Sequence, residues 1–475
     1  MSTNDRIVIH IFTRDFRLQD NPSLFHAASC GRVWPVFIDD HDYDPYPAGG
    51  ASRWWLYQSL KDLQQRLSGG LSIFKGELVQ VISELVERFP VQGVFWNRYF
   101  DQYHRGQEDQ LLKILQKRGI AGRNFNAALL WNPWLITKDD GTFYKVFTPF
   151  YRRGCLSGPY KPRPVLQTPS HLEMANVVEL DPGLALDSSG ILPSHAWHKK
   201  LESYWKVSED AAHQCLQQFI ENGIGDYKKG RDFPGKKHVS RLSPYLRHGQ
   251  ISPSQIWDAV DDLPPDDNVA HFKSELGWRE FSYYLLFHYP HLPEQNLQPK
   301  FDRFQWEQSA EMLDAWQRGL TGIPIVDAGM RELYETGYMH NRLRMIVGSF
   351  LVKNMGHHWV EGERWFRNCL VDFDLASNSA SWQWVAGCGT DAAPYFRIFN
   401  PVTQGQRFDP EGIYTKRFVP ELARLPQACL FAPWEAPGLV LQEADVVLGD
   451  NYPRPIVDLK SSREVALEKF RKLSS

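Results

Sequence analysis

Short apolar runs alternate with helical patterns along the first 130 residues of the chain. Residues Ser52–Leu67 and Leu78–Phe89 carry apolar side chains three and four positions apart, which predicts amphipathic helices. The runs around them are rich in β-branched and aromatic residues and predict the strands Ile7–Phe12, Val33–Ile38, Leu71–Lys75 and Gly93–Asn97. Strands alternating with helices indicate a doubly wound, Rossmann-like parallel sheet, which binds ligands at the carboxyl ends of its strands. The turn after the first strand, Thr13–Asn21, has no GxGxxG motif, so an ordinary dinucleotide site is not expected there.

The pattern changes after this α/β region. From about Trp131 to Pro193 the chain is rich in Pro, Gly and Ser and has little periodicity, which indicates a long connector. After Leu201, apolar positions recur at helical spacing in the stretches 211–220, 256–260, 275–287, 311–320 and 342–352. The predicted organisation is an α/β domain over residues 1–130, a connector over 131–200 and an all-helical domain over 201–475.

Composition narrows the class of protein. The six cysteines are scattered without a CxxC pair, which predicts reduced thiols in a cytoplasmic protein and indicates neither a disulfide framework nor a metal site. No run of about 18 apolar residues occurs, so a membrane span is not expected. The net charge of −3 means that nucleic-acid binding would need a local basic patch. Seventeen tryptophans in 475 residues suit either large aromatic cores or stacking on flat ligands and bases.

A basic segment at residues 226–250 contains the first candidate for ligand chemistry. Within it, Val239-Ser240-Arg241-Leu242-Ser243 precedes Pro244, so two hydroxyls, an arginine and backbone N–H groups lie at the predicted start of a helix. This arrangement is typical of a phosphate cradle. A solvated basic loop and an ordinary helix cap are the alternatives.

Three further groups of polar residues lie within helical patterns. Glu275, Trp278 and Arg279 share a helix face, where a carboxylate beside an indole suits stacking on a base; a surface ion pair beside a half-buried Trp is the alternative. Asn341, Arg344 and Met345 also share one side of a helix, and arginines at the start of an apolar helix are costly unless they meet anions. The third group lies among aromatic residues and consists of Asp372, Asp374 and Asn378, with Arg344–Asp372 expected as a buried pair.

The sequence has no GxSxG elbow, P-loop, HExxH motif or Cys/His cluster, so hydrolase chemistry is not indicated. The residues instead predict a pocket for a large, flat, phosphate-bearing ligand in a tryptophan-rich helical domain.

Taken together, these segments resemble the photolyase/cryptochrome family over nearly the whole chain. The resemblance rests on motifs in the family's order and spacing, namely Arg14–Leu18 with Asn21-Pro22, Ser240–Leu246, Trp278–Phe281, Thr321-Gly322 with Val326–Met330, Met339–Arg342, and Trp382–Trp384 through Phe399–Pro401. It implies light-dependent repair of DNA by a carbon–carbon lyase that uses FAD. Reduced FADH⁻ would give one electron to a flipped-out cyclobutane pyrimidine dimer, the ring would split, and the electron would return.

The resemblance also implies roles for individual residues. The implied flavin contacts are Tyr227, Val239, Ser240, Arg241, Leu242, Ser243, Arg344, Asp372, Phe373, Asp374 and Asn378, with Asn378 at flavin N5. The implied catalytic residues around the dimer are Glu275, Asn341, Met345 and Asn378. The implied DNA contacts are Glu275, Trp278, Arg279, Asn341, Arg342, Trp384, Arg397 and Gln404. The implied electron chain runs from Trp382 beside the flavin through Trp359 to Trp306 at the surface.

Within the family, Asn341, Met345 and Asn378 indicate the class I dimer photolyases, acting as monomers on ultraviolet-damaged double-stranded DNA. The implied second pigment is methenyltetrahydrofolate, or a deazaflavin or flavin, or none. Arg53, Asn97 and Asp101 lie where they would face an antenna in the α/β domain; Trp54 and Trp55 would stack on it or form a packed helix face. The competing functions are a cryptochrome-like blue-light receptor without repair activity, and a DNA-binding flavoprotein with dark redox chemistry.

Overall fold

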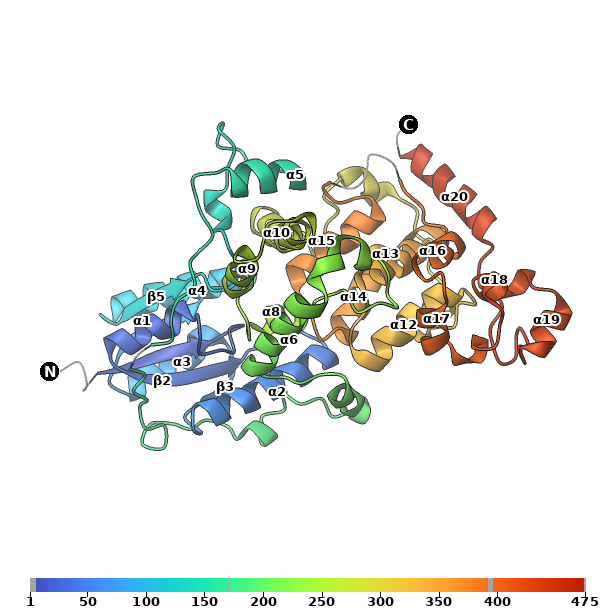
Figure 1. Ribbon diagram of the computed structural model, residues 1–475. Helices are drawn as coiled ribbons and strands as arrows, with labels where there is room; N and C mark the ends of the chain where they lie inside the picture. The colour runs from blue at the N-terminus through green and yellow to red at the C-terminus, as the bar shows by residue number, and fades with distance from the viewer. Residues whose placement is uncertain (1–5, 170, 392–395, 474–475) are drawn as a thin grey trace. The chain divides into compact units, whose positions relative to one another are not determined.

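The computed structural model describes residues 6–169, 171–391 and 396–473, which form two compact units (Figure 1). Unit 1 comprises Met1–Gly225, Ser240–Pro290 and Val371–Ala376, and unit 2 comprises Asp226–Val239, His291–Leu370 and Ser377–Ser475. These units group residues by contact and place several helices beyond residue 201 with the sheet. The domain boundaries at 130 and 200 therefore stay a prediction.

Unit 1 contains a sheet of five parallel strands in the order β3-β2-β1-β4-β5. The strands are β1 (Ile7–Phe12), β2 (Arg32–Asp39), β3 (Ser72–Lys75), β4 (Val91–Asn97) and β5 (Ala121–Phe125). The first four confirm the predicted strands. The fifth was not predicted, because Ala-Gly-Arg-Asn-Phe has neither an apolar run nor an alternating pattern.

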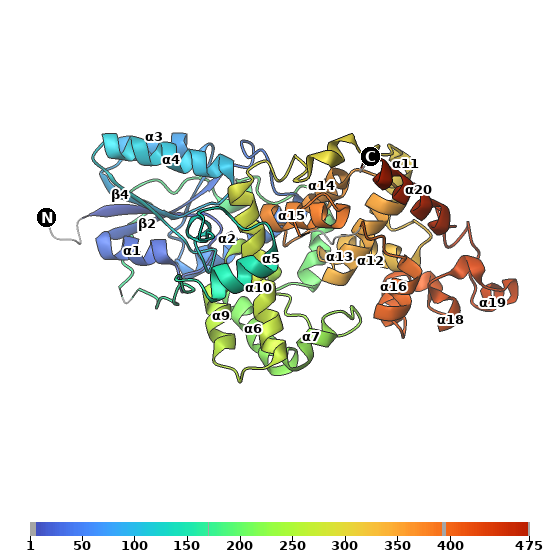
Figure 2. The same cartoon turned by 90° about the horizontal axis from the view of Figure 1, so that it is seen from above.

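Helices cover both faces of the sheet. One apolar core packs α1 (Pro22–Cys30) and α2 (Gly50–Arg66) against Val8, Phe12 and their neighbours. The opposite core packs α3 (Leu78–Arg88) and α4 (Gln102–Lys117) against Ile9, Ile11 and their neighbours. Figure 2 shows the strands between α1 on one side and α3 and α4 on the other. The alternation of inward positions along β1 thus produces a doubly wound layer, as predicted.

The rest of unit 1 is a loop-rich connector and a set of helices. The connector holds α5 (Phe147–Pro149), a π-helical turn at Phe150–Leu156 and short 3₁₀ turns, and it touches the sheet at two isolated bridges, Val33–Met174 and Ile73–Gly183. The helices are α6 (Glu209–Asn222), α8 (Ser243–His248), α9 (Pro253–Asp261) and α10 (Asp267–His288). Buried Glu280 of α10 accepts hydrogen bonds from the main-chain N–H groups of Leu130 and Trp131, which fixes the start of the connector.

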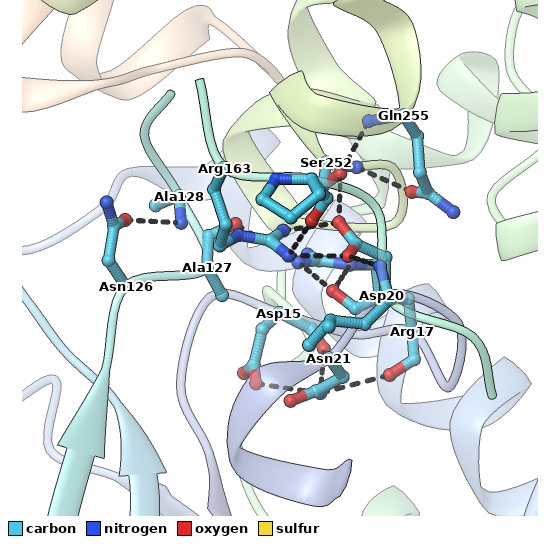
Figure 3. A network of polar contacts seen from close by, with 12 residues as sticks. Asp15, Arg17, Asp20, Asn21, Asn126, Ala127, Ala128, Arg163, Ser252 and Gln255 are labelled. Carbon is cyan, nitrogen blue, oxygen red and sulfur yellow. Dashed lines mark hydrogen bonds and ion pairs between the residues drawn. The ribbon is translucent and has the colours of Figure 1, made fainter. Parts of the chain in front are cut away.

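A buried polar network holds the turn after β1 (Figure 3). The Arg17 guanidinium is inaccessible to solvent and donates hydrogen bonds of 2.8 to 3.2 Å to three main-chain carbonyl oxygens, those of Asp20, Ala127 and Gly249. The Asp20 carboxylate accepts hydrogen bonds from Arg163 and from Ser252. Burial opposes ionisation of Asp20, but Arg163 and Arg17 outweigh it and lower the Asp20 pKa. The network joins the N-terminal turn, the connector and the turn between α8 and α9.

Unit 2 is helical in all of its described residues. Its helices are α7 (Tyr227–Gly230), α11 (Ala310–Arg318), α12 (Pro324–Thr336), α13 (Asn341–Ser349), α14 (Trp359–Cys369), α15 (Leu375–Ala386, in unit 2 from Ser377), α16 (Pro401–Phe408), α17 (Ile413–Phe418), α18 (Gln427–Leu430), α19 (Gly438–Glu443) and α20 (Leu459–Lys472). No helix in the described part of the chain has the length and apolarity needed to cross a membrane. The predicted combination of a doubly wound sheet and a helical region is confirmed.

Candidate functional site

The segment Ser240–Ser243 in unit 1 forms a turn that opens α8. Arg241 has a left-handed backbone with φ of 53°, and Leu242 follows with φ of −81° and ψ of −10°. Alternation of left- and right-handed helical residues turns successive N–H groups toward one side, which creates an anion-binding concavity. The turn therefore has the chemistry expected of a phosphate cradle.

The segment Val371–Ala376 is clamped to α8 and α10 within unit 1. The Ser243 hydroxyl donates to Asp372 Oδ2 at 2.6 Å, and the Tyr283 hydroxyl donates to Asp374 Oδ2 at 2.5 Å. Arg247 and His248 donate to the main-chain carbonyls of Phe373 and Val371. Burial lowers the pKa of Arg247 to about 10, so the guanidinium stays charged at neutral pH. Two of the predicted flavin contacts, Asp372 and Asp374, thus hold fixed carboxylates.

Helix α10 presents the predicted dimer contacts of unit 1. Glu275 is partly exposed, with Oε1 3.7 Å from His271 Nε2, and Trp278 stacks on Phe147 with ring centroids 3.8 Å apart. Gly277 allows this packing, because a Cβ there would lie 2.5 Å from Cδ2 of Tyr151. The indole of Trp278 is thereby held on one face by Phe147.

Arg279, on the same helix, is engaged inside unit 1. Its Nη1 donates to the Ala128 carbonyl at 2.7 Å, and its guanidinium lies over the Tyr283 ring. The predicted DNA contact of Arg279 is not tested by this geometry and stays a prediction.

Helix α13 of unit 2 begins at the predicted dimer contact Asn341. Asn341 is exposed and Met345, one turn later, is half-buried. The imidazole of His340 caps the helix, since its Nδ1 accepts the main-chain N–H of Arg342 at 3.2 Å. Burial lowers the pKa of His340 to about 3, so the cap is a neutral ring.

The two arginines of α13 have different environments. Arg342 pairs with Asp232 at 2.5 Å and lies over the Phe408 ring. Arg344 donates from Nε to the Met339 carbonyl at 2.8 Å. Pairing with an internal carboxylate and a carbonyl meets part of the cost of placing these cations at an apolar helix.

Asn378 lies on α15 and is oriented by α14. Its Nδ2 donates to both the main-chain oxygen and Oε1 of Glu363, at 3.1 and 3.0 Å. Glu363 is buried and its other carboxylate oxygen accepts from Arg367 at 2.7 Å. Because both amide hydrogens of Asn378 are directed at Glu363, the side chain meets any further group through its oxygen.

The three predicted electron carriers all lie in unit 2. Trp382 and Trp359 are buried, whereas Trp306 is partly exposed. A Cβ at Gly362 would lie 2.1 Å from Cη2 of Trp382, so this indole rests on the backbone of α14 one turn after Trp359. Trp359 Nε1 donates to Asn296 Oδ1 at 2.9 Å. The ring of Trp382 also contacts Phe366 and Trp316, with centroids 4.9 and 6.3 Å away.

The remaining predicted contacts of unit 2 are less constrained. Trp384 is half-buried and donates from Nε1 to the Asp391 carbonyl at 3.1 Å. Arg397 is exposed and Gln404 lies partly exposed on α16. Tyr227 is buried under the guanidinium of Arg231, and Val239 is half-buried. Exposure suits Arg397 for a phosphate contact, which stays a prediction.

The residues expected to face an antenna are bonded to the protein itself. Arg53 forms a double hydrogen bond with Asp39 and donates to the carbonyls of Gly190 and Ile191. Asn97 donates to Asp15 and Asn21, and Asp101 accepts from the ring and backbone of His104. Trp54 and Trp55 are buried, with Trp55 donating to Gln250. These side chains hold the carboxyl edge of the sheet together.

Sequence reasoning missed residues that act through others. Tyr283 fixes Asp374, and Glu363 orients Asn378. The Glu363–Arg367 spacing of four residues signals an ion pair but not its burial or its second partner. Gly362 carried no sequence signal, because a helix glycine reveals a close contact only once its neighbour is known.

Fold and site together define a class of protein. A doubly wound sheet, an anion-binding turn, clamped carboxylates and a line of buried indoles are features of a nucleotide-cofactor protein that transfers electrons.

Comparisons with known proteins identify the family. Residues 8–169 match the family described as DNA photolyase, and residues 272–472 match the FAD binding domain of DNA photolyase. The chain is 41% identical to the deoxyribodipyrimidine photo-lyase of Agrobacterium fabrum, over 99% of this chain and 98% of the relative. It is 35% identical to Cryptochrome-2 of Arabidopsis thaliana, over 97% of this chain and 78% of the relative. The chain therefore belongs to the photolyase/cryptochrome family. It has the FAD-binding domain of that family, and light-dependent DNA repair is better supported than photoreception.

One solved structure corrects the predicted subtype. A structure titled as a bacterial class III photolyase from Agrobacterium tumefaciens superposes with a TM-score of 0.94 and 40% identity, covering 99% of this chain and 98% of that chain. The expectation of class I is therefore wrong at the level of subtype. The residues behind it, Asn341, Met345 and Asn378, concern the dimer and the flavin, and they do not separate one class of dimer photolyase from another.

Proposed function

We propose that this protein repairs cyclobutane pyrimidine dimers in DNA in a light-dependent reaction with reduced FAD. Similarity to a deoxyribodipyrimidine photo-lyase along 99% of the chain carries the proposal. The similarity to a class III structure further places the protein in class III. We also assign it to the cytoplasm, acting as a monomer on double-stranded DNA.

The residues present fit the cofactor. The turn at Arg241 and Leu242 supplies inward N–H groups for phosphates, and the fixed carboxylates of Asp372 and Asp374 supply acceptors for polar groups of the flavin and ribose. The oriented Asn378 oxygen suits a protonated flavin nitrogen, which favours a reduced flavin. We further assign flavin contacts to Tyr227, Val239, Ser240, Ser243, Arg344 and Phe373. When bound, reduced FAD supplies the electron that splits the cyclobutane ring and then takes it back.

The chain's own residues bind and position the damaged base pair. Glu275 offers a carboxylate to the dimer, and the Trp278 indole, held by Phe147, offers a flat apolar surface. The exposed amide of Asn341 and the thioether of Met345 supply a second polar and apolar pair. Extrusion into such a pocket is easier for a dimer than for a normal base, because a dimer stacks and pairs poorly.

Phosphate contacts set affinity around the lesion. Arg342, Arg397 and Arg279 supply positive charge, and Trp384 and Gln404 extend the same surface. Contacts to phosphates carry no sequence information, which suits an enzyme that must act on any sequence. Binding should weaken as salt rises, because each neutralised phosphate releases counterions.

A blue-light receptor without repair activity is the second candidate, favoured by 35% identity to Cryptochrome-2 over 97% of this chain. The two functions differ in one measurement. Dimer-containing oligothymidylate is illuminated with near-ultraviolet or blue light in the presence of the reduced protein, and recovery of thymine absorbance is followed against a dark control. Repair predicts light-dependent recovery; a receptor predicts none, and that result would overturn the proposal.

Glu275→Ala tests the dimer contact within this assay. Loss of the carboxylate is expected to lower repair yield and affinity for damaged DNA while FAD content stays close to that of the wild type. Glu468→Ala is the matched control, because Glu468 is also a helix carboxylate in an i, i+4 pair, with Lys472. A fall in FAD content alone in Glu275→Ala would contradict the assigned role.

A further inference from the structure

The imidazole of His358 touches two of the three tryptophans assigned to the electron chain. Its ring centroid lies 4.8 Å from that of Trp306 and 5.5 Å from that of Trp359. These two distances bound the separation of the indole centroids at about 10 Å. We propose that His358 is a positioning residue that bridges Trp306 and Trp359, so that an electron passes between the indoles through its ring. This inference rests on the proposed function, because it assigns a residue to the same electron chain.

The ring is fixed by the helix that follows it. His358 is the N-cap of α14, and its Nδ1 accepts the main-chain N–H of Val360 at 3.1 Å. In the neutral ring the proton therefore sits on Nε2. Burial lowers the pKa of His358, and Arg364 supports this shift while Glu361 and Asp302 oppose it. The bridge is thus an oriented, uncharged ring, which does not repel a positive charge on either indole.

The surroundings of Trp359 keep the charge moving outward. The Trp359 N–H is donated to the amide oxygen of Asn296, which is too weak a base to remove the proton from an oxidised indole. The Nδ1 atom of His358 is already occupied by Val360. Oxidised Trp359 therefore keeps its proton and is neutralised only by receiving an electron.

The electron and proton balance of the outward step is simple. One electron leaves Trp306 and fills the hole on Trp359, so that Trp359 becomes neutral and Trp306 becomes a radical cation. Trp306 is partly exposed and releases its indole proton to water. An external thiol then returns one hydrogen atom to the Trp306 radical and is itself left as a thiyl radical.

Two substitutions separate the bridge from the helix cap. His358→Asn keeps a side chain that caps helices well but removes the ring, whereas His358→Phe keeps an aromatic ring but removes the cap. Laser-flash absorption of the FAD-loaded protein measures how fast the Trp306 radical appears. Thermal unfolding of the flavin-free protein measures the cap without any contribution from the cofactor. Trp306→Phe and Trp382→Phe test the chain itself.

The expected pattern is specific to the bridge. His358→Asn should slow formation of the Trp306 radical severalfold with the melting temperature of the flavin-free protein almost unchanged. His358→Phe should lower that melting temperature and form the radical faster than His358→Asn. Repair with chemically reduced flavin should be unaffected in both.

Other results overturn the inference at different levels. If His358→Asn forms the radical at the wild-type rate while Trp306→Phe abolishes it, the chain stands and the bridge is wrong. Equal slowing in both His358 variants also refutes the bridge, because the loss would then follow from a displaced helix. If Trp306→Phe and Trp382→Phe leave photoreduction intact, the assigned chain fails and the bridge fails with it, whereas repair itself is judged by thymine recovery.

Discussion

Gly362 is the contact point between α14 and the indole of Trp382, and Gly362→Ala is the sharpest test of that packing. The added Cβ would lie 2.1 Å from Cη2 and 2.5 Å from Cζ3 of Trp382, whereas ordinary contact begins at 3.4 Å. The indole must therefore move by about 1.3 Å, the difference between 2.1 and 3.4 Å. Overpacking of this kind costs about 1–3 kcal/mol. Alanine recovers about 1 kcal/mol of helix propensity. The net expectation is a loss of unfolding free energy of up to about 2 kcal/mol, together with slower photoreduction.

A matched substitution isolates the clash from the change in helix propensity. Gly106 lies within α4, and a Cβ there would meet no heavy atom within 4 Å. Gly106→Ala should therefore stabilise the protein by about 0.5–1 kcal/mol and leave photoreduction unchanged. Chemical denaturation gives the stabilities, and bleaching of the oxidised flavin band under blue light in the presence of a thiol gives the photoreduction rates. If Gly362→Ala were stabilised as much as Gly106→Ala, the reasoning about the Trp382 contact would be refuted.

Two further predictions concern buried charges in unit 1. Arg17→Met should lower the unfolding free energy by about 3–5 kcal/mol, because it leaves the Arg17-bound carbonyls without their donor and Asp20 without a neighbouring cation. Chemical denaturation beside Arg318→Met, which removes only one partner of an exposed pair, checks this; similar small losses in both would contradict it. Burial disfavours the His104 imidazolium, but Asp101 and Asp40 outweigh burial and raise its pKa from 6.5 to about 10. A raised folded pKa means that the stabilisation is complete below about pH 6.5 and is lost as pH rises through about 10, so the stability difference between wild type and His104→Gln should shrink across that interval. A difference that grows with pH would show that the imidazolium does not stabilise the fold.

The periodic part of the fold was predictable from the sequence alone. Apolar runs such as Ile7–Phe12 face both cores, so their pattern reports a doubly covered strand directly. The strand Ala121–Phe125 escaped because it is polar and paired only along one edge, with β4. Its place in the sheet depends on partner strands and not on its own pattern.

The site was predictable where helical spacing brings residues together. Glu275 and Trp278 share a face of α10 because they lie three positions apart. The antenna positions failed for a physical reason that applies generally. Asn97 and Asp101 lie at strand ends, where ligand contacts and internal hydrogen bonds require the same polar groups, and only the partner atoms distinguish the two uses. The link between Asn378 and Glu363 joins two helices, and no local pattern in either helix indicates it.

Packing of α14 against α15 sets the amide and the inner indole of the electron chain together. Gly362 and Glu363 are adjacent on α14, and they contact Trp382 and Asn378, which lie one turn apart on α15. A shift of one helix along the other therefore moves both contacts at once. It follows that Gly362→Ala and Glu363→Gln should not be additive, because the indole displaced by the first change strains the hydrogen bonds weakened by the second. A coupling energy of about 0.5 kcal/mol or more in the double variant is expected for residues in one contact network. Strict additivity would mean that each α14 residue acts on its own partner, and that the two α15 side chains are positioned independently.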